Sequence, residues 1–462
     1  MSMELSELKG KKIAVIGLGK TGIALSRFLL KHGSELLISD HKSEAELAGS
    51  LEEVKGLPIK FELEGHNPKS LIQQDYVILS PGVPFHLKIF DYIKSHGVKV
   101  TGEFEFASRF VKEPMTVITG TNGKTTVLEL AELFLQKSNI NVWTGGNYKR
   151  PLSQYLCEDK KADVILIEAS SFMLEHVEEM RAKNIVFTNL AQNHLDRYSN
   201  MQDYMQAKRK VFTNTSENTT SILNADNNAV IEIARDPLVQ KGIIFYFSTR
   251  KSLKPQIMNI GGAVMIGDEI QLRTRPEIEY YSLKNTPLRG KHSSENIMAA
   301  ILIAKEHGGE WMSIQRGIDE YKGSPHRIEY VRRVGGVNFY NDSKATNVLA
   351  VSRALDAFDE NVILIMGGKN TGLNYKPLAD SIRKKVKNLI LVGEAKENIN
   401  RHIGDCTETF LIGTFDEAVF ISYHKSRIHD TVLLSPGCPS FDIFNSYIER
   451  GDHFKSLVKK FK

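Results

Sequence analysis

Short, continuous runs of apolar residues, many of them β-branched, recur along this chain, and helical patterns follow them. The runs are Ile13–Ile16, Leu36–Ile38, Tyr76–Leu79, Met115–Ile118, Val164–Ile167, Ile185–Phe187, Val362–Met366, Leu389–Val392 and Val432–Leu434. Strands of a parallel sheet are covered by helices on both faces, so they are apolar on both sides. The pattern therefore predicts an α/β fold assembled from several βαβ units.

Three blocks can be separated along the chain. Residues 1–103 form the first, 104–324 the second and 325–462 the third, in agreement with the roughly three domains that 462 residues favour. Within the second block, the stretch from Thr213 to Thr286 is rich in Asn and Gly. It contains the short β-like runs Ile243–Phe247, Ala263–Ile266 and Glu269–Leu272. We therefore expect a β-rich edge on this block.

Composition and charge exclude several classes of protein. The 60 Lys and Arg against 55 Asp and Glu give a net charge of +5, which is no basis for a nucleic-acid scaffold. Cys157, Cys406 and Cys438 are far apart and odd in number, as expected of reduced thiols rather than of disulfides or a zinc site. Charged residues open the chain, and no apolar run is long enough to span a membrane. We expect a cytoplasmic protein of several domains.

The first glycine-rich turn, Gly17-Leu18-Gly19-Lys20-Thr21-Gly22, directly follows Ile13–Ile16. A G-x-G-x-x-G pattern between a strand and a helix lets the backbone approach a phosphate at the helix N-terminus. Asp40 closes the next predicted strand, where an acid often binds a ribose hydroxyl. These residues alone favour a dinucleotide site only modestly over a tight turn that binds nothing, with Asp40 as a helix cap.

The second turn, Gly120-Thr121-Asn122-Gly123-Lys124-Thr125-Thr126, follows Met115–Ile118 and resembles a shortened phosphate loop. Its backbone N–H groups would hold phosphates, Lys124 would offset their charge, and Thr125 would take a Mg²⁺ position. Glu168 ends the run Val164–Ile167, and a carboxylate at such a strand end suits a Mg²⁺ ligand. The second block is therefore predicted to be an ATPase domain, with a hydrolase and a ligase both open.

Segments that span nearly the whole chain resemble the Mur ligases, in that family's order. They are Gly17–Gly22 with Ser39-Asp40, Ser80–Val83, Gly120–Thr126, Gly145–Asn147, Glu168–Phe172, Asn193–Arg197, Tyr204–Lys208, Pro325–Arg327, Asn341–Asn347 and Ser435–Asp442. The resemblance implies a Rossmann-like N-terminal domain, a central P-loop ATPase-type α/β domain with a β-rich edge, and a C-terminal Rossmann-like α/β domain. Within the family, the segments are most similar to ligases that add D-glutamate.

The resemblance implies an ATP-dependent amide ligase of cytoplasmic peptidoglycan synthesis. ATP would phosphorylate the carboxylate of UDP-N-acetylmuramoyl-L-alanine, and D-glutamate would capture the acyl phosphate, giving ADP and phosphate. The first block would then hold UDP rather than NAD. The implied cofactors are ATP and two Mg²⁺ ions. A monomer that acts on these small molecules, without nucleic acid, is expected.

The same resemblance implies the site residues, position by position. The UDP substrate would contact Gly19, Lys20, Thr21, Asp40, His41, Ser80, Pro81, Gly82 and Asn147. ATP would contact Gly120, Thr121, Asn122, Gly123, Lys124, Thr125, Thr126, Asn296, Arg327 and Asp342. D-Glutamate would contact Lys344, Thr346, Ser440 and Tyr447. The metal ligands would be Thr125, Glu168 and His194, and the catalytic residues Lys124, Glu168, His194 and Lys208. Lys208 matches the lysine that family members carbamylate with CO₂.

The chain departs from the family pattern in places, and its motifs admit other functions. Tyr148 and Lys149 stand where Ile-Gly is usual, and Thr371 stands where some members place a lysine for the glutamate, with Lys369 nearby. Alternatives within the superfamily are a ligase for another amino acid, disfavoured because no Asp-Asn-Pro-Arg string occurs, and a folylpolyglutamate synthase, disfavoured by the N-terminal block. A dinucleotide-dependent oxidoreductase would leave Gly120–Thr126 unused. A non-catalytic nucleotide-binding regulator is a further alternative.

Overall fold

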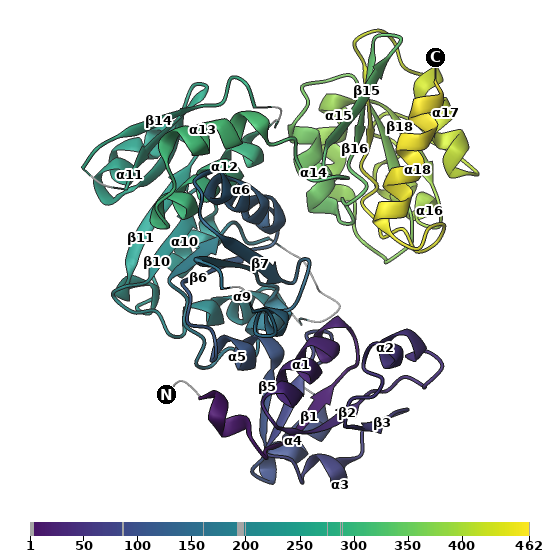
Figure 1. The fold of residues 1–462 in the computed structure, drawn as a ribbon. Helices are drawn as coiled ribbons and strands as arrows, with labels where there is room; N and C mark the ends of the chain where they lie inside the picture. The colour runs from purple at the N-terminus through teal and green to yellow at the C-terminus, as the bar shows by residue number, and fades with distance from the viewer. Residues whose placement is uncertain are drawn as a thin grey trace. The chain divides into compact units, whose positions relative to one another are not determined.

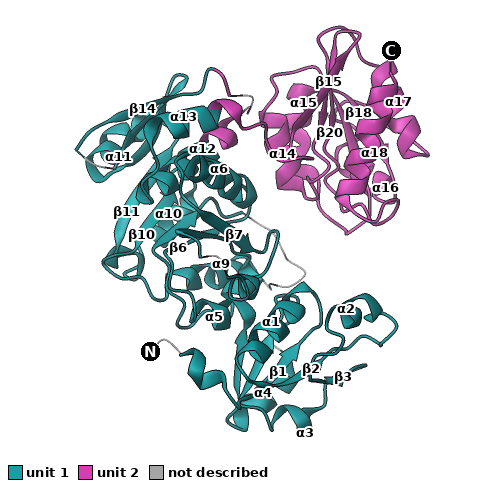
Figure 2. Cartoon of the chain, viewed as in Figure 1, with its two compact units in different colours: residues 1–284, 295–318 teal, residues 285–294, 319–462 magenta. Residues whose placement is uncertain are grey.

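The computed structural model describes residues 4–85, 87–159, 161–191, 198, 200–274, 276–286, 288 and 290–461. In these residues the strands form three sheets, of five, nine and six strands (Figure 1). The chain divides into two compact units (Figure 2). Unit 1, residues 1–284 and 295–318, contains the first two sheets, and unit 2, residues 285–294 and 319–462, contains the third.

The first sheet is fully parallel, in the order β3-β2-β1-β4-β5. Its strands are β1 Lys12–Ile16, β2 Glu35–Ser39, β3 Ile59–Glu62, β4 Tyr76–Leu79 and β5 Lys99–Gly102. The accompanying helices are η1 Leu5–Leu8, α1 Lys20–Lys31, α2 Ala48–Glu53, α3 Pro68–Leu71 and α4 Lys88–Ser95. The strand order reverses between β1 and β4, and ligands of such sheets bind at the carboxyl ends of the strands at that point.

The second sheet has the order β14-β13-β12-β11-β10-β9-β6-β8-β7. Its strands are β6 Met115–Thr119, β7 Val142–Gly146, β8 Val164–Glu168, β9 Asn184–Phe187, β10 Thr220–Asn224, β11 Ile243–Ser248, β12 Gly262–Ile266, β13 Glu269–Arg273 and β14 Glu279–Ser282. The strands β12, β13 and β14 pair antiparallel at one end, whereas the others pair parallel. The predicted β-rich edge is thereby confirmed.

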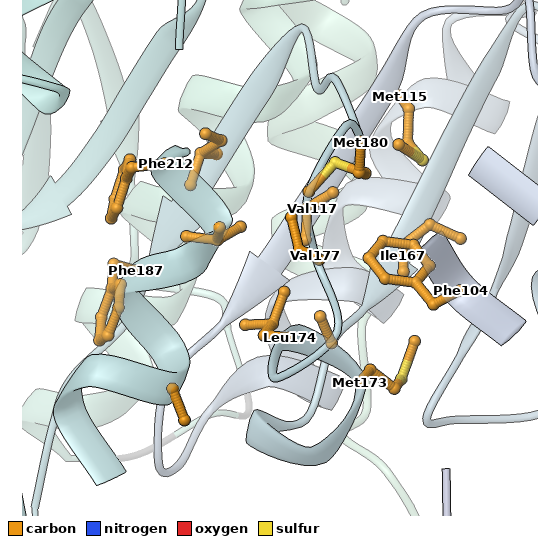
Figure 3. Close-up of a cluster of buried hydrophobic side chains, with 14 of the residues drawn as sticks. Phe104, Met115, Val117, Ile167, Met173, Leu174, Val177, Met180, Phe187 and Phe212 are labelled. Carbon is orange, nitrogen blue, oxygen red and sulfur yellow. The ribbon is translucent and has the colours of Figure 1, made fainter. Parts of the chain in front are cut away.

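Helices surround this second sheet. They are α5 Glu103–Ser108, α6 Lys124–Lys137, α7 Leu152–Tyr155, α8 Ser171–Leu174, α9 Met201–Arg209, η2 Lys210–Phe212, α10 Asn228–Ala234, η3 Val239–Lys241, η4 Lys251–Leu253, α11 Lys254–Ile260, α12 Lys291–Glu306 and α13 Trp311–Glu320. Figure 3 shows the cluster beneath one face, where Val117 of β6, Ile167 of β8 and Phe187 of β9 are fully buried. The loops that follow these strands therefore start from a rigid, close-packed base.

The third sheet has the order β15-β16-β20-β17-β18-β19, and only β15 pairs antiparallel within its described strands. The strands are β15 Glu329–Val334, β16 Val337–Asn341, β17 Val362–Gly367, β18 Val386–Val392, β19 Glu408–Leu411 and β20 Thr431–Leu434. The helices are α14 Val348–Asp356, η5 Lys376–Leu378, α15 Ala379–Lys385, α16 Lys396–Ile403, α17 Phe415–His424 and α18 Tyr447–Lys460. Leu364 and Met366 of β17 enter one core cluster, and Ile363 and Ile365 enter the other.

The α/β prediction is confirmed, and every apolar run that predicted a strand lies within one. The strands that the pattern missed include β3 and β19, which lie at sheet edges and are only partly buried. Because such strands face solvent along their length, they need no continuous apolar run. In the described part of the chain, no helix is both long enough and apolar enough to cross a membrane.

Candidate functional site

The turn between β6 and α6 has the backbone of a phosphate-binding loop. Gly120 and Gly123 adopt φ angles of 137° and 87°, which L side chains rarely tolerate. A Cβ atom on Gly123 would lie 2.4 Å from Oδ1 of Asn296, so the side chain of Asn296 packs directly against the turn. The first N–H groups of α6 have no partner within the helix and can bind an anion. The structure thus places Asn296 beside Gly120–Thr126, as predicted.

Glu168 lies at the end of β8, next to the start of α6. It is 4% exposed, and its Oε2 accepts a hydrogen bond from the Thr125 hydroxyl at 2.7 Å. Its Oε1 accepts one from Nδ2 of Asn147 at 3.2 Å. Nζ of Lys124 donates to the carbonyls of Gly120 and Thr121, at 2.9 and 3.0 Å. The structure therefore brings the ammonium, hydroxyl and carboxylate groups predicted for this loop together.

The donor set at Thr125 and Glu168 fits a Mg²⁺ ion. A hydroxyl and a carboxylate are hard oxygen ligands, and Mg²⁺ in nucleotide sites uses few protein ligands besides phosphates and water. Among the residues that the structure describes, no group of three or more His, Cys, Asp and Glu side chains could hold a metal by itself. His194, the other predicted ligand, lies outside the described residues.

Lys208 of α9 is almost completely buried, at 1% exposed. Its Nζ donates to the Thr119 hydroxyl at 3.2 Å and lies 5.1 Å from the ring centroid of Tyr204. Burial, with a further contribution from the charge of Lys124, holds the pKa of Lys208 well below its usual value, although Glu168 opposes the shift. The side chain is therefore a buried amine beside the phosphate loop, and not a solvated helix face.

The N-terminal turn is built in the same way after β1. Gly17 has a φ of 95°, and a Cβ atom on Gly22 would lie 2.1 Å from the carbonyl oxygen of Gly17. The Ser80 hydroxyl, from the loop after β4, donates to that same carbonyl at 3.2 Å. Oδ2 of Asp40 accepts a hydrogen bond from the Leu18 N–H at 2.8 Å. Asp40 therefore holds the glycine turn, but it caps no described helix, because Gly19 is the N-cap of α1 and Leu47 that of α2.

The remaining residues predicted for UDP surround this turn. Gly19 precedes α1, and Lys20 and Thr21 form its first residues. The His41 side chain is 76% exposed, with Nδ1 at 3.4 Å from Asp40. Pro81 and Gly82 lie in the turn after β4. These groups lie at the carboxyl ends of β1, β2 and β4, where the strand order predicts a ligand.

In unit 2, Asp342 directly follows β16 and is 6% exposed. Its oxygens accept hydrogen bonds from the Ser435 hydroxyl at 2.7 Å and from the Ile328 N–H at 3.2 Å. Burial raises the pKa of Asp342 to about 7, because these hydrogen bonds and the charge of Arg327 only partly oppose the desolvation. The charge of Arg327 thus acts on Asp342, and both residues were predicted to contact ATP.

The residues predicted for D-glutamate lie in the same unit, three of them on loops and Tyr447 at the start of α18. Nζ of Lys344 is 5.3 Å from the ring centroid of Tyr447, a cation–π distance. Ser440 is 2% exposed, and within the described residues its hydroxyl has no hydrogen-bonding partner. Thr346 precedes Asn347, the N-cap of α14. A buried hydroxyl without a partner is uncommon and points to a ligand that supplies one.

Comparisons with known proteins cover the whole chain. A relative from Bdellovibrio bacteriovorus, a UDP-N-acetylmuramoylalanine–D-glutamate ligase, is 63% identical over 461 residues, which is 100% of both chains. The chain belongs to the Mur ligase family. A relative of the same name from Geotalea daltonii is 38% identical over 98% of both chains. The family models that match are Mur ligase MurD-like, N-terminal domain (residues 11–102), Mur ligase middle domain (118–304) and Mur ligase, glutamate ligase domain (326–438).

Solved Mur ligase structures share the fold of this Mur ligase. A pseudomurein peptide ligase from Methanothermus fervidus gives a TM-score of 0.61 at 19% identity, covering 98% of this chain and 100% of that one. A UDP-N-acetylmuramate–alanine ligase from Thermotoga maritima gives 0.58 at 16% identity, covering 97% and 99%. The predicted family and the three-domain architecture are thereby confirmed.

Sequence reasoning missed residues that hold the site of this Mur ligase in place. The Thr188 hydroxyl donates to the carbonyl of Asn122 at 2.6 Å, and Oδ1 of Asn189 accepts the Asn122 N–H at 3.0 Å. Their position directly after the apolar run Ile185–Phe187 was a usable signal, since polar residues after a buried strand meet at one sheet edge. Arg450, in the first turn of α18, gave no such signal.

Proposed function

We propose that this Mur ligase joins D-glutamate to UDP-N-acetylmuramoyl-L-alanine, with conversion of ATP to ADP and phosphate. The substrate carboxylate attacks the γ-phosphorus and ADP leaves, which gives an acyl phosphate. The amine of D-glutamate then attacks the acyl carbon, phosphate leaves, and the nitrogen loses a proton. The names of the full-length relatives from Bdellovibrio bacteriovorus and Geotalea daltonii support this choice of amino acid and acceptor.

The observation that carries the ATP-dependent part is the hydrogen bond between Thr125 and Glu168, 2.7 Å long, directly behind the glycine turn. Gly120–Thr126 hold the phosphates through backbone N–H groups, and Asn296 borders the same turn. The ammonium of Lys124 offsets the charge that develops during transfer. In unit 2, Arg327 and Asp342 contribute to ATP binding.

Two Mg²⁺ ions complete the proposed ATP site. Thr125 would hold one of them, and Glu168 with His194 would hold the other. Bound there, the ions would neutralise phosphate oxygens and the substrate carboxylate, so that two anions can approach each other. The protein would hold its oxygen ligands in place and shield them from water, which the burial of Glu168 and Thr125 supports.

Lys208 is proposed to become a carbamate. Its nitrogen adds to the carbon of CO₂ and loses one proton, which converts an amine into an anion. The reaction requires a neutral amine, and the lowered pKa of this buried lysine supports its presence. The resulting anion would lie near Glu168 and support the metal region electrostatically.

The other domains hold the remaining substrates. Residues 1–103 bind the UDP moiety through Gly19, Lys20, Thr21, Asp40, His41, Ser80, Pro81 and Gly82, joined by Asn147 of the ATP-binding domain, residues 104–324. Residues 325–462 bind D-glutamate through Lys344, Thr346, Ser440 and Tyr447. Cationic and hydroxyl groups suit a dicarboxylate, and the buried Ser440 hydroxyl supports this placement. The enzyme acts as a cytoplasmic monomer.

Phosphate release tests the proposed function. Purified protein receives ATP, Mg²⁺, UDP-N-acetylmuramoyl-L-alanine and each amino acid in turn. Phosphate should appear only with D-glutamate and only with the UDP-sugar present. Release that ignores D-glutamate and follows another amino acid would refute the assignment. Lys124→Ala should abolish turnover, and full activity of that variant would remove the glycine turn from the mechanism.

A further inference from the structure

His66 lies at the carboxyl end of the first sheet, beside the residues proposed for UDP, and has no role in the function proposed above. The chain turns after β3 and returns to the end of β2. There the Gly65 N–H donates to the carbonyl of Asp40 at 3.1 Å. Nδ1 of His66 lies 2.7 Å from the Ser39 hydroxyl oxygen. The turn after β3 is thus attached to the end of β2 by both backbone and side-chain hydrogen bonds.

The end of β2 is also hydrogen-bonded to the glycine-rich turn Gly17–Gly22. The Gly17 N–H donates to the carbonyl of Ser39 at 2.9 Å, and the Leu18 N–H donates to Oδ2 of Asp40 at 2.8 Å. The glycine turn, the end of β2 and the turn at His66 therefore form one hydrogen-bonded rim. A nucleotide with its pyrophosphate at the N-terminus of α1 extends its ribose toward the end of β2, and its base beyond it.

The Ser39 hydroxyl determines which nitrogen of His66 carries the proton. Ser39 Oγ also lies 3.2 Å from the carbonyl oxygen of Gly65, to which it donates. A hydroxyl has one proton, so Ser39 must accept from Nδ1–H of His66, and Nε2 keeps its lone pair. Within the part of the chain that the structure describes, no hydrogen bond reaches Nε2.

The imidazole is also held in its neutral form. Burial lowers the pKa of His66, with help from the charge of His41, and this outweighs the opposing charges of Asp40 and Glu62. Asp40 is less available as an acceptor than His66, because its two oxygens accept the N–H groups of Leu18 and Lys42 at 2.8 and 3.0 Å. Of these two side chains, His66 therefore retains the acceptor that the described residues do not use.

We propose that Nε2 of His66 accepts a hydrogen bond from N3–H of the substrate's uracil and so selects uracil over cytosine. The inference rests on the proposed function, which brings a UDP-sugar to this domain. Uracil carries a proton on N3, whereas cytosine has only a lone pair there. Two facing lone pairs repel, and both groups would lose water without gaining a partner, which is how a polar site rejects the wrong ligand.

Calorimetric titration of the full chain with UDP and with CDP tests this proposal. We expect the wild type to bind UDP more tightly than CDP. His66→Ala should weaken UDP binding between about twofold and about tenfold, the effect of one lost hydrogen bond, and should not weaken CDP binding, because the facing lone pair is removed. His66→Gln, which again offers an acceptor oxygen, should restore part of the preference. His96→Ala is the matched control, because the His96 side chain is exposed and hydrogen-bonds only to Tyr92 and Ser95 among the described residues.

Ser39→Ala gives a second test if His66→Ala does not fold. This variant keeps the imidazole but removes the group that sets its tautomer, so the preference for UDP should fall without being lost. An unchanged preference for UDP in a folded His66→Ala protein would overturn the proposal. If the wild type binds neither nucleotide, the proposed function fails as well. If the wild type binds UDP and uses D-glutamate while His66→Ala keeps the preference, only the role of His66 fails.

Discussion

Arg450 donates from Nε to the hydroxyl of Ser343 at 3.0 Å and from Nη2 to the carbonyl of the same residue at 2.8 Å. Nη2 also donates to the carbonyl of Cys438 at 3.0 Å, and Nη1 to that of Gly367 at 3.4 Å. Arg450 is 2% exposed, so these bonds are shielded from water. One side chain of α18 therefore joins three loops at the carboxyl end of the third sheet, and two of them contain Lys344 and Ser440.

Arg450→Lys should raise the KM for D-glutamate about tenfold and leave the KM for ATP nearly unchanged. Lysine keeps the charge but cannot reproduce the planar set of donors, so the loops around Ser343 and Cys438 lose their common anchor. Steady-state kinetics with each substrate varied in turn measures the effect. Arg332→Lys is the control, because Arg332 is a more exposed arginine that bonds to the Lys459 carbonyl. Equal rises in the KM for D-glutamate and the KM for ATP would contradict a role of Arg450 that is specific to the D-glutamate site.

Glu168→Gln should lower kcat at least about a hundredfold with little change in stability. The amide keeps the shape and accepts from Thr125, but it removes the charge that a Mg²⁺ ligand needs. Turnover against Mg²⁺ concentration and the thermal midpoint are the measurements. Glu132→Gln serves as the control, since Glu132 pairs with Lys149 at 2.9 Å on the outer side of α6. A Glu168→Gln enzyme with wild-type Mg²⁺ dependence would refute the metal assignment.

Lys208 should give a carbamate signal in ¹³C NMR spectra of protein equilibrated with ¹³C-bicarbonate. Burial lowers the pKa of Lys208 and so favours the neutral amine, which is the form that reacts with CO₂. Lys208→Met should lose both the signal and most of the activity. Lys210→Met should keep both, because Nζ of Lys210 binds the Glu175 carbonyl on an exposed surface. A signal that persists in Lys208→Met would place the carbamate elsewhere.

Gly22→Ala should lower the free energy of unfolding by about 2 kcal/mol and weaken UDP binding. The added Cβ would lie 2.1 Å from the carbonyl oxygen of Gly17, and backbone atoms cannot move aside as a flexible side chain can. Gly19→Ala is the matched control, because nothing lies within 4 Å of its added Cβ. Denaturant titration compares them. Equal stability of the two variants would show that the turn is not tightly closed.

Asp342 should make stability depend on pH. Its pKa is raised from 3.8 to about 7, so its contribution is fully present below pH 3.8 and is lost as the pH rises through about 7. Relative to Asp342→Asn, the wild type should lose about 1.4 kcal/mol per pH unit between about pH 4 and pH 7. Denaturant titrations of both proteins across this range measure the difference. If the wild type instead becomes more stable relative to Asp342→Asn as the pH rises, the folded state favours the charged carboxylate.

The residues of the two glycine turns could be predicted because their spacing encodes local geometry. Gly17 and Gly120 follow apolar runs, precede helices and require positive φ angles, all of which depend on neighbours in the chain. Glu168 was found in the same way, since a carboxylate after a buried strand emerges at the sheet edge where ligands bind.

Residues far apart in the chain could not be paired in this way. Arg450 contacts Ser343 across 107 positions, and nothing in the pattern of α18 distinguishes it from the solvated arginines of other helices. Lys208 stands in a basic run, Lys208-Arg209-Lys210, that suggests an exposed face, yet packing buries it beside Thr119.

The sequence by itself determined the α/β class, the two glycine-rich turns and the family. Periodicity and glycine spacing act over a few residues, and they are visible without knowledge of the fold. Only the tertiary structure decided that Lys208 is a buried amine, that Asp342 is desolvated, and that Nδ1 of His66 lies against the Ser39 hydroxyl. Desolvation and tautomer choice depend on which distant groups pack together, and that is a property of the folded chain.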